Sequence, residues 1–165
     1  MNMKIIAFIL AVVIGLPAAQ AQLKATPVCP VFTVDVLEGN INHKLDCIST
    51  SGEVQKIFPC FNDVVEETNG STCGGVFYKD KDIYFYTERD YIEIREKFKG
   101  VLDPALMGVN RNLLFKLLGN PKMKDAAFEA YQTKYGTLVL YFDTKGKINK
   151  LQITNKSTET LKLCE

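Results

Sequence analysis

Cys73 is the residue of this sequence that most suggests a catalytic nucleophile. It lies in the run NGSTCGG (69–75), between small residues and a glycine pair that favours a tight turn. A cysteine nucleophile needs a base that removes the thiol proton, and His43 is the only histidine of the chain. These two residues define one hypothesis, a small hydrolase that uses Cys73 with His43 as its base.

A disulfide is the competing interpretation of Cys73. The run is similar to the Gly-x-Cys-Gly-Gly of chymotrypsin-like viral cysteine proteases, but that resemblance implies a double β-barrel longer than this chain. Five cysteines in an exported chain predict disulfides first. Spacing does not determine which cysteines pair. We expect two bridges, Cys47–Cys60 and Cys73–Cys164, and one unpaired cysteine.

Paired carboxylates are a second route to hydrolysis, because glycosidases use two acidic side chains that need only be close in space. Four acidic residues are candidates, namely Glu88, Asp90, Glu93 and Glu96. Glu93 alternates with Ile92 and Ile94, and this pattern predicts that it faces solvent. One histidine and the lack of Cys-x-x-Cys or His-x-x-x-His spacing predict no metal site, and we expect no cofactor.

Tyrosines give the strongest indication of a binding surface. Tyr84 and Tyr86 share one face of a predicted strand, while Ile83 and Phe85 share the other, and Tyr91 follows in the next strand. Tyrosine is enriched at binding sites, although it is also a favoured strand residue and this face could cover a second core. We therefore predict binding by Tyr84, Tyr86 and Tyr91, with Tyr→Ala changes that lower affinity and leave the fold intact.

The elements that would position these residues indicate an α+β fold with an antiparallel sheet. Alternating or apolar runs predict strands over 30–37, 76–78, 83–86, 91–95, 127–133, 137–142 and 148–154, and a short strand or extended tail over 158–163. A helix is also compatible with 91–95. Asn110 caps a predicted helix over 111–118 that ends at Gly119, and its apolar face carries Leu113, Leu114, Leu117 and Leu118. The helix precedes a C-terminal three-stranded meander, and residues 22–165 form one predicted domain.

The N-terminus predicts export. Lys4, the apolar run 5–16, Pro17 and Ala19-Gln20-Ala21 together form a signal peptide over residues 1–21, with too short an apolar run to span a bilayer. Cys29 lies too far downstream to be a lipidated cysteine. The remaining 144 residues carry 19 basic and 19 acidic side chains, which argues against a nucleic-acid partner. We expect a periplasmic or secreted protein whose partner is a protein or a carbohydrate.

The segment 108–153 resembles a known unit. It contains GVNRNLLFKLLGNP, a capped leucine helix that ends in Leu-Leu-Gly-x-Pro, and then YQTKYGTLVLYFDTKGKINKLQI, a Tyr strand, an apolar strand, a Gly turn and a final strand. This order resembles the helix-plus-meander unit of the small outer-membrane assembly lipoproteins (SmpA/OmlA), which the β-lactamase inhibitor protein shares (BLIP-like). The resemblance implies a non-enzymatic protein-binding scaffold. In general style the chain also looks like exported Bacteroidales proteins of unknown function.

Three functions follow from these observations. The first is an exported binding protein that performs no chemistry, which we expect. The second is a small exported hydrolase that uses Cys73 or a carboxylate pair, and the third is a structural component of the cell envelope. An open pocket around a residue with a perturbed pKa would favour the hydrolase, whereas an exposed tyrosine patch would favour the binding protein.

Overall fold

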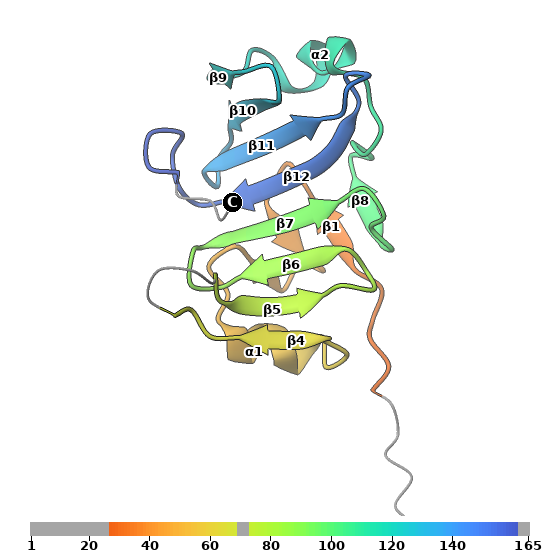
Figure 1. Cartoon of the computed structure of the whole chain (residues 1–165), viewed down its shortest axis with the longest axis vertical. Helices are drawn as coiled ribbons and strands as arrows, with labels where there is room; N and C mark the ends of the chain where they lie inside the picture. The colour runs from red at the N-terminus through yellow and green to blue at the C-terminus, as the bar shows by residue number, and fades with distance from the viewer. Residues whose placement is uncertain (1–26, 69–72, 162–165) are drawn as a thin grey trace, which may run out of the picture.

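A large antiparallel sheet with a small sheet packed on one face forms the structure, a computed structural model that describes residues 27–68 and 73–161 (Figure 1). The large sheet has eight strands in the order β4-β5-β6-β7-β12-β11-β10-β9. They are β4 (Asp63–Val65), β5 (Gly75–Tyr78), β6 (Ile83–Tyr86), β7 (Tyr91–Arg95), β9 (Met123–Lys124), β10 (Phe128–Gln132), β11 (Thr137–Phe142) and β12 (Ile148–Thr154). Two meanders, β4 to β7 and β9 to β12, therefore join along the β7–β12 pair.

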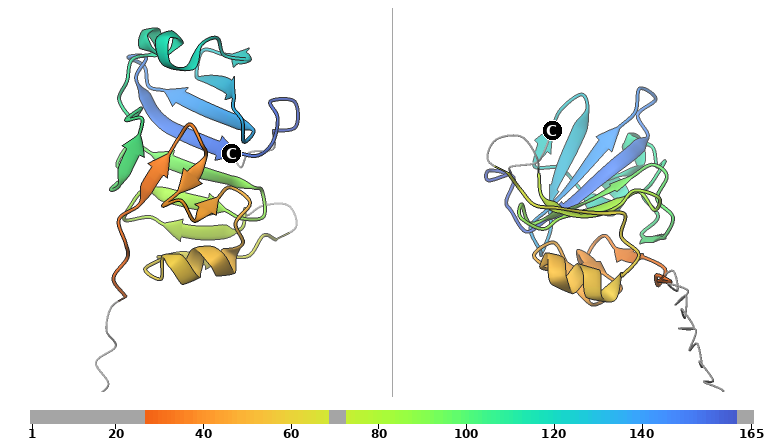
Figure 2. Two further views of the ribbon diagram at one scale, coloured as in Figure 1. Left: turned by 180° about the vertical axis from the view of Figure 1, so that it is seen from behind. Right: turned by 60° about the horizontal axis from the view of Figure 1, so that its bottom comes forward.

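The small sheet has four strands in the order β3-β2-β1-β8. They are β1 (Thr33–Asp35), β2 (Asn40–Ile41), β3 (Leu45–Asp46) and β8 (Val101–Asp103), and β8 runs parallel to β1. Together with the helix α1 (Ser51–Ile57), this sheet lies against the rear face of the large sheet (Figure 2). Within the described ranges no helix has the length and apolar character required to cross a membrane.

The main core fills the space between the two sheets and α1. The large sheet contributes residues such as Phe85, Ile92 and Leu151, and the small sheet and α1 contribute Val34 and Phe58, all at most 1% exposed. Phe32 stacks on Phe58 with ring centroids 4.0 Å apart. Burial of these apolar groups is the main source of stability and fixes which face of the large sheet points inward.

The α+β fold with an antiparallel sheet is confirmed, and most of the predicted strands are present. Six elements were missed: the helix α1 and the short strands β2, β3, β4, β8 and β9. Thr50 and Glu53 form a capping box, because the Thr50 hydroxyl accepts a hydrogen bond from the Glu53 N–H and the Glu53 carboxylate accepts one from the Thr50 N–H at 2.8 Å. This signal was present in the sequence, in a segment interpreted as irregular.

The predicted leucine face of the helix over 111–118 is wrong in part. The segment forms a 3₁₀ turn (Arg111–Leu113) followed by α2 (Phe115–Leu118). A change of helix type breaks the 3.6-residue periodicity on which the prediction was based. Leu114 is buried, whereas Leu113 is 58% and Leu117 47% exposed. Downstream, the described part of the predicted tail strand, residues 158–161, forms a turn and no strand.

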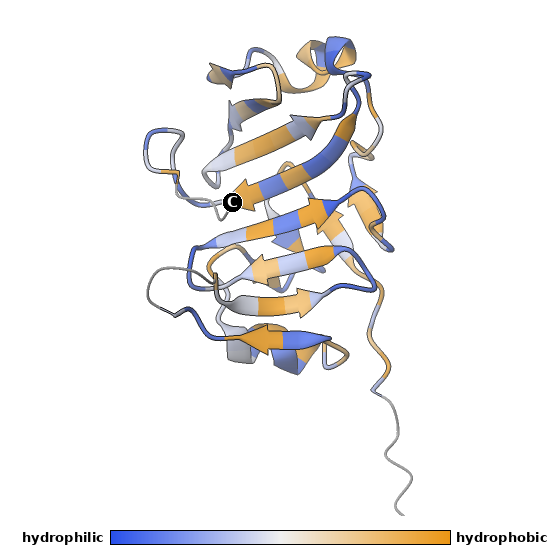
Figure 3. Ribbon diagram, viewed as in Figure 1, coloured by the Kyte–Doolittle hydropathy of each residue, from blue (hydrophilic) through white to orange (hydrophobic). Residues whose placement is uncertain are grey.

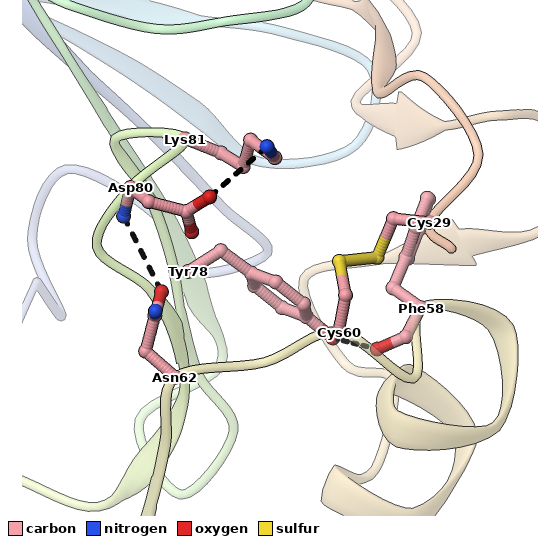
Figure 4. The surroundings of a disulfide bond; sticks show 7 residues. All are labelled: Cys29, Phe58, Cys60, Asn62, Tyr78, Asp80 and Lys81. Atoms are coloured by element: carbon pink, nitrogen blue, oxygen red, sulfur yellow. Dashed lines mark hydrogen bonds and ion pairs between the residues drawn. A yellow bond between two sulfur atoms is a disulfide. The ribbon is translucent and has the colours of Figure 1, made fainter. Parts of the chain in front are cut away.

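The predicted Cys47–Cys60 bridge is also wrong. Cys60 is bonded to Cys29, with the Cα atoms 5.5 Å apart, because the segment before β1 runs past the end of α1 (Figure 4). Cys47 is instead a free, buried thiol of the core, and burial raises its pKa to about 11. Cys73 is disulfide-bonded. Its predicted partner, Cys164, lies outside the described residues, as does the predicted signal peptide.

The Cys29–Cys60 bridge lies beside a hydrogen bond that fixes the end of α1. The Tyr78 hydroxyl donates to the Phe58 carbonyl at 2.6 Å, and Tyr78 itself is fully buried in β5 (Figure 4). The disulfide thus ties the N-terminal segment to the point where α1 already contacts the large sheet.

Arg111 fixes the opposite end of the large sheet. Its guanidinium donates to the Glu129 carboxylate at 2.9 Å and to the Ala126 carbonyl at 3.1 Å, and it lies 4.5 Å from the centroid of the Phe142 ring. Tyr131 donates a second hydrogen bond to Glu129 at 2.6 Å. Burial alone would raise the pKa of Glu129, but the hydrogen bonds from Tyr131 and Arg111 hold the pKa below its ordinary value.

We predict that alkylation modifies Cys47 only after unfolding. The buried thiol with a raised pKa provides little thiolate to react in the native protein.

Mass mapping without reduction should find the Cys29 and Cys60 peptides linked. Replacement of both bridged residues by Ser should lower the free energy of unfolding by about 3–4 kcal/mol, given the 31-residue separation. Rapid native labelling of Cys47, or a Cys47–Cys60 peptide, would contradict this assignment.

The Arg111–Glu129 pair predicts a pH dependence. Because the pKa of folded Glu129 is lowered, its contribution to stability is present above the unfolded pKa of about 4.3 and is lost as pH falls through the folded pKa. Wild type should therefore lose more stability below that pH than Glu129→Gln in denaturant titrations. Arg111→Leu should lower stability at neutral pH by about 2 kcal/mol, less than the roughly 3–5 kcal/mol for a buried charge left alone. The loss is smaller because Glu129 keeps the Tyr131 hydrogen bond and Lys124 at 3.5 Å. Parallel pH profiles for wild type and Glu129→Gln would refute the assignment.

Candidate functional site

The front face of the large sheet, which we call the open face, has no described helix or strand in front of it (Figure 1). Side chains of a strand alternate between the two faces, and apolar residues and polar ones alternate along β7 and β12 (Figure 3). Ile92 and Ile94 point into the core, so Glu93 and Arg95 lie on the open face. The central residues of the open face are Tyr84, Tyr86, Tyr91, Glu93, Arg95, Tyr141, Lys150 and Gln152.

Strand register arranges these residues in rows across the sheet. One row runs Tyr84–Glu93–Gln152–Val139 over β6, β7, β12 and β11. The next row contains Arg95, Lys150 and Tyr141, again as direct cross-strand neighbours. Directly opposed side chains are close enough to interact, so each row is a line of contacts.

Glu93 is buried at the centre of the open face, which corrects the expectation that it faces solvent. It is only 2% exposed although no described element covers it. Its carboxylate accepts hydrogen bonds from Arg95 Nε at 2.5 Å and Gln152 Nε2 at 2.7 Å, and it lies 3.5 Å from Lys150 Nζ. The larger side chains around it exclude water, and the charge remains paired.

Glu93 also explains how two cations can be direct neighbours. Arg95 and Lys150 lie opposite each other on β7 and β12. Like charges in this position repel each other, but Glu93 contacts both cations and offsets the repulsion. Within this cluster one carboxylate lies between two cations, so one positive charge remains, and it lies at the surface beside the acidic side chains of Asp82 and Glu96. The Arg95 and Lys150 side chains remain 44% and 31% exposed.

Aromatic rings hold the two cations in place. The Arg95 guanidinium carbon lies 4.1 Å from the centroid of the Tyr84 ring, and Lys150 Nζ lies 4.0 Å from that of the Tyr141 ring. Cation–π contacts of this kind are attractive and limit the motion of the cation. Tyr141 also donates its hydroxyl hydrogen to Gln152 Oε1 at 2.9 Å, which orients the Gln152 amide toward Glu93.

The structure brings the three predicted binding tyrosines together but buries two of them. Tyr84 is 9% and Tyr91 1% exposed, and Tyr86 stacks on Tyr91 with centroids 4.4 Å apart. Burial raises the pKa of both Tyr84 and Tyr86. The rings of Tyr84 and Tyr91 therefore pack beneath the surface of the open face, and little of either ring is accessible to a partner. The expectation that Tyr→Ala changes spare the fold does not fit Tyr91, whose truncation would leave a cavity.

A groove of about 520 Å³ opens beside the two cations. Its polar lining comes from the turn before β6, the end of β7 with the following loop, and β12, namely Asp82, Arg95, Glu96, Lys97, Asn149 and Lys150. Ala127, before β10, and Tyr141 and Phe142 of β11 complete it. This volume lies within the range of small-ligand sites. Sequence reasoning missed the groove because its residues come from distant segments.

The residues proposed for catalysis are not assembled into a catalytic site. Cys73 is held in a disulfide and is not a thiolate nucleophile, and His43 is exposed in the turn between β2 and β3 with φ of 53°. Among the acids, Glu88 accepts a hydrogen bond from the Glu67 N–H at 3.3 Å. Asp90, in the turn before β7, forms an ion pair with Lys156. Glu96 follows β7, whereas Glu88 and Asp90 precede it, so the length of the strand separates Glu96 from both of them.

Comparisons with known proteins do not identify the chain: no protein-family model matches it, and neither does any curated protein or solved structure. In the two described ranges, no group of three or more His, Cys, Asp or Glu residues could hold a metal ion.

Glu93→Leu should destabilise the protein through the loss of this charge network. We expect a decrease of about 2 kcal/mol in the free energy of unfolding, less than the roughly 3–5 kcal/mol for a fully buried pair, because Arg95 and Lys150 keep access to water. Glu96→Leu, the same substitution at an exposed position, is the matched control and should change stability by less than about 0.5 kcal/mol. Equal effects of the two substitutions in denaturant titrations would contradict the central role of Glu93.

Proposed function

We propose that this chain is an exported binding protein that uses the open face to hold a macromolecular partner and performs no chemistry. The observation that carries the proposal is the pair of partly exposed cations, Arg95 and Lys150, fixed above aromatic rings beside a groove. A surface whose charged groups are already held in place loses little side-chain freedom on binding, which favours affinity.

Three further features support this proposal. Arginine and tyrosine are enriched among the residues that dominate binding energies, and both occur at the centre of the open face. The Cys29–Cys60 disulfide is compatible with an oxidising compartment outside the cytoplasm. The disulfide at Cys73 removes the strongest candidate nucleophile, which makes the hydrolase hypothesis less favourable.

The test is a comparison of partner capture by matched variants. The face variant carries Arg95→Ser and Lys150→Ser, and the control carries Lys44→Ser and Lys134→Ser, two exposed lysines away from the groove. Both variants lose two positive charges. Each immobilised protein is exposed to secreted proteins and envelope glycans of the source cells, after circular dichroism confirms that it is folded.

We expect the control to retain the same partner as wild type and the face variant to retain at least tenfold less, equivalent to about 1.4 kcal/mol of binding free energy. Equal retention of every partner by the face variant and wild type would contradict the proposal.

A further inference from the structure

The geometry points to the carboxylate of an acidic sugar as the group that the groove accepts, so that the partner is a glycan carrying sugar acids. This inference rests on the proposed function and specifies the ligand class of the same site. Three properties of the groove support it: the adjacent cations, the acidic groups beside them, and the unused hydrogen-bonding groups in an opening of suitable size.

The first property is that two adjacent cations can bind one carboxylate together. Arg95 and Lys150 are direct cross-strand neighbours, and both line the groove. Arg95 uses Nε to bind Glu93 and also forms a side-chain hydrogen bond with Tyr86, and its guanidinium has further N–H groups that can donate to a ligand. A second carboxylate placed between the two cations could accept charge-assisted hydrogen bonds from both of them.

The second property is that acidic groups limit how much negative charge can enter. Asp82 and Glu96 lie on the same lining as the cations. Phosphate chains and sulfated polymers carry charges on adjacent groups, and these two acids would repel such dense charge more strongly than the single carboxylate that each ring of a sugar-acid chain carries. Carboxylates accept hydrogen bonds readily from hydroxyl groups, and Asp82, which already accepts from the Tyr84 hydroxyl and the Lys97 N–H, retains further acceptor sites. One carboxylate among several hydroxyls is the pattern of a sugar acid.

The third property is unused hydrogen-bonding capacity. Among the residues that the structure describes, neither the Asn149 amide nor the Lys97 ammonium group forms a side-chain hydrogen bond or ion pair. Both lie in the groove, and an amide can donate to one hydroxyl while it accepts from another. A groove of about 520 Å³ has room for a few sugar rings and is open at its rim, as a site for a chain requires.

The experiment is a titration of the full folded protein with three trisaccharides: trigalacturonate, its methyl ester and neutral galactotriose. All three present similar hydroxyls, but only the first carries charged carboxylates. Binding is measured by calorimetry, and its location by NMR shifts of the Asn149 and Arg95 side chains. We expect trigalacturonate to bind at the groove and the ester and neutral sugars to bind at least tenfold more weakly.

Variants and salt test the location and the charge. Lys150→Met keeps the contact with the Tyr141 ring and removes the charge, and Lys97→Gln changes a residue outside the Glu93 network. Each should weaken trigalacturonate binding several-fold, whereas Lys116→Gln on α2 should not. Raising ionic strength from about 0.01 M to about 0.15 M, which shortens the Debye length from about 30 Å to about 8 Å, should also weaken it.

Several results would overturn the inference. Equal affinity for the acid and its ester would exclude recognition of a carboxylate. Binding that Lys150→Met and Lys97→Gln leave unchanged would place the sugar elsewhere. If no trisaccharide shifts the groove resonances while partner capture still depends on Arg95 and Lys150, the ligand class is wrong and the proposed function stands. If capture is also independent of Arg95 and Lys150, the proposed function fails as well.

Discussion

The arrangement of the open face depends on one buried carboxylate, Glu93. A charged group removed from water must be paired and hydrogen-bonded, and Glu93 meets this condition through Arg95, Gln152 and Lys150. The same contacts also fix the positions of the Arg95 and Lys150 cations and of the Gln152 amide. The outward charge of the open face is therefore set by a group that a partner could not reach.

The position of Glu93 connects this local constraint to the fold. The Glu93–Gln152 hydrogen bond crosses from β7 to β12, the pair of strands at which the two meanders join. On the rear face, Ile92, Ile94 and Leu151 of the same two strands pack in the core. The β7–β12 pair, the seam between the meanders, is thus apolar on the core side and charged on the open face. Arg111 and Glu129 pin the outer strands of the second meander, away from this seam.

The alternation of apolar and polar residues was enough to predict the longer strands, and it was not enough to predict the site. The alternation in 83–86 and 91–95 shows which residues share a face, since this follows from strand geometry alone. It does not show that Gln152, 59 residues away, lies beside Glu93 and supplies one of the hydrogen bonds to this buried carboxylate. The pairing of Cys29 with Cys60 likewise depends on the path of the chain around α1, which spacing does not reveal. The capping box at Thr50 and Glu53 was a local signal that was available and overlooked.

The most direct test of this account is the hydrogen exchange of the Arg95 Nε–H, observed by nitrogen-resolved NMR of the arginine side chains. If Glu93 holds Arg95 over the Tyr84 ring, this proton should give a separate resonance and exchange much more slowly than the protons of freely exposed side chains. In Glu93→Gln the protection should decrease, because a neutral amide is a weaker acceptor than a carboxylate. Fast exchange in the wild type, equal to that of a solvent-exposed arginine, would show that Arg95 is not fixed and would contradict the account.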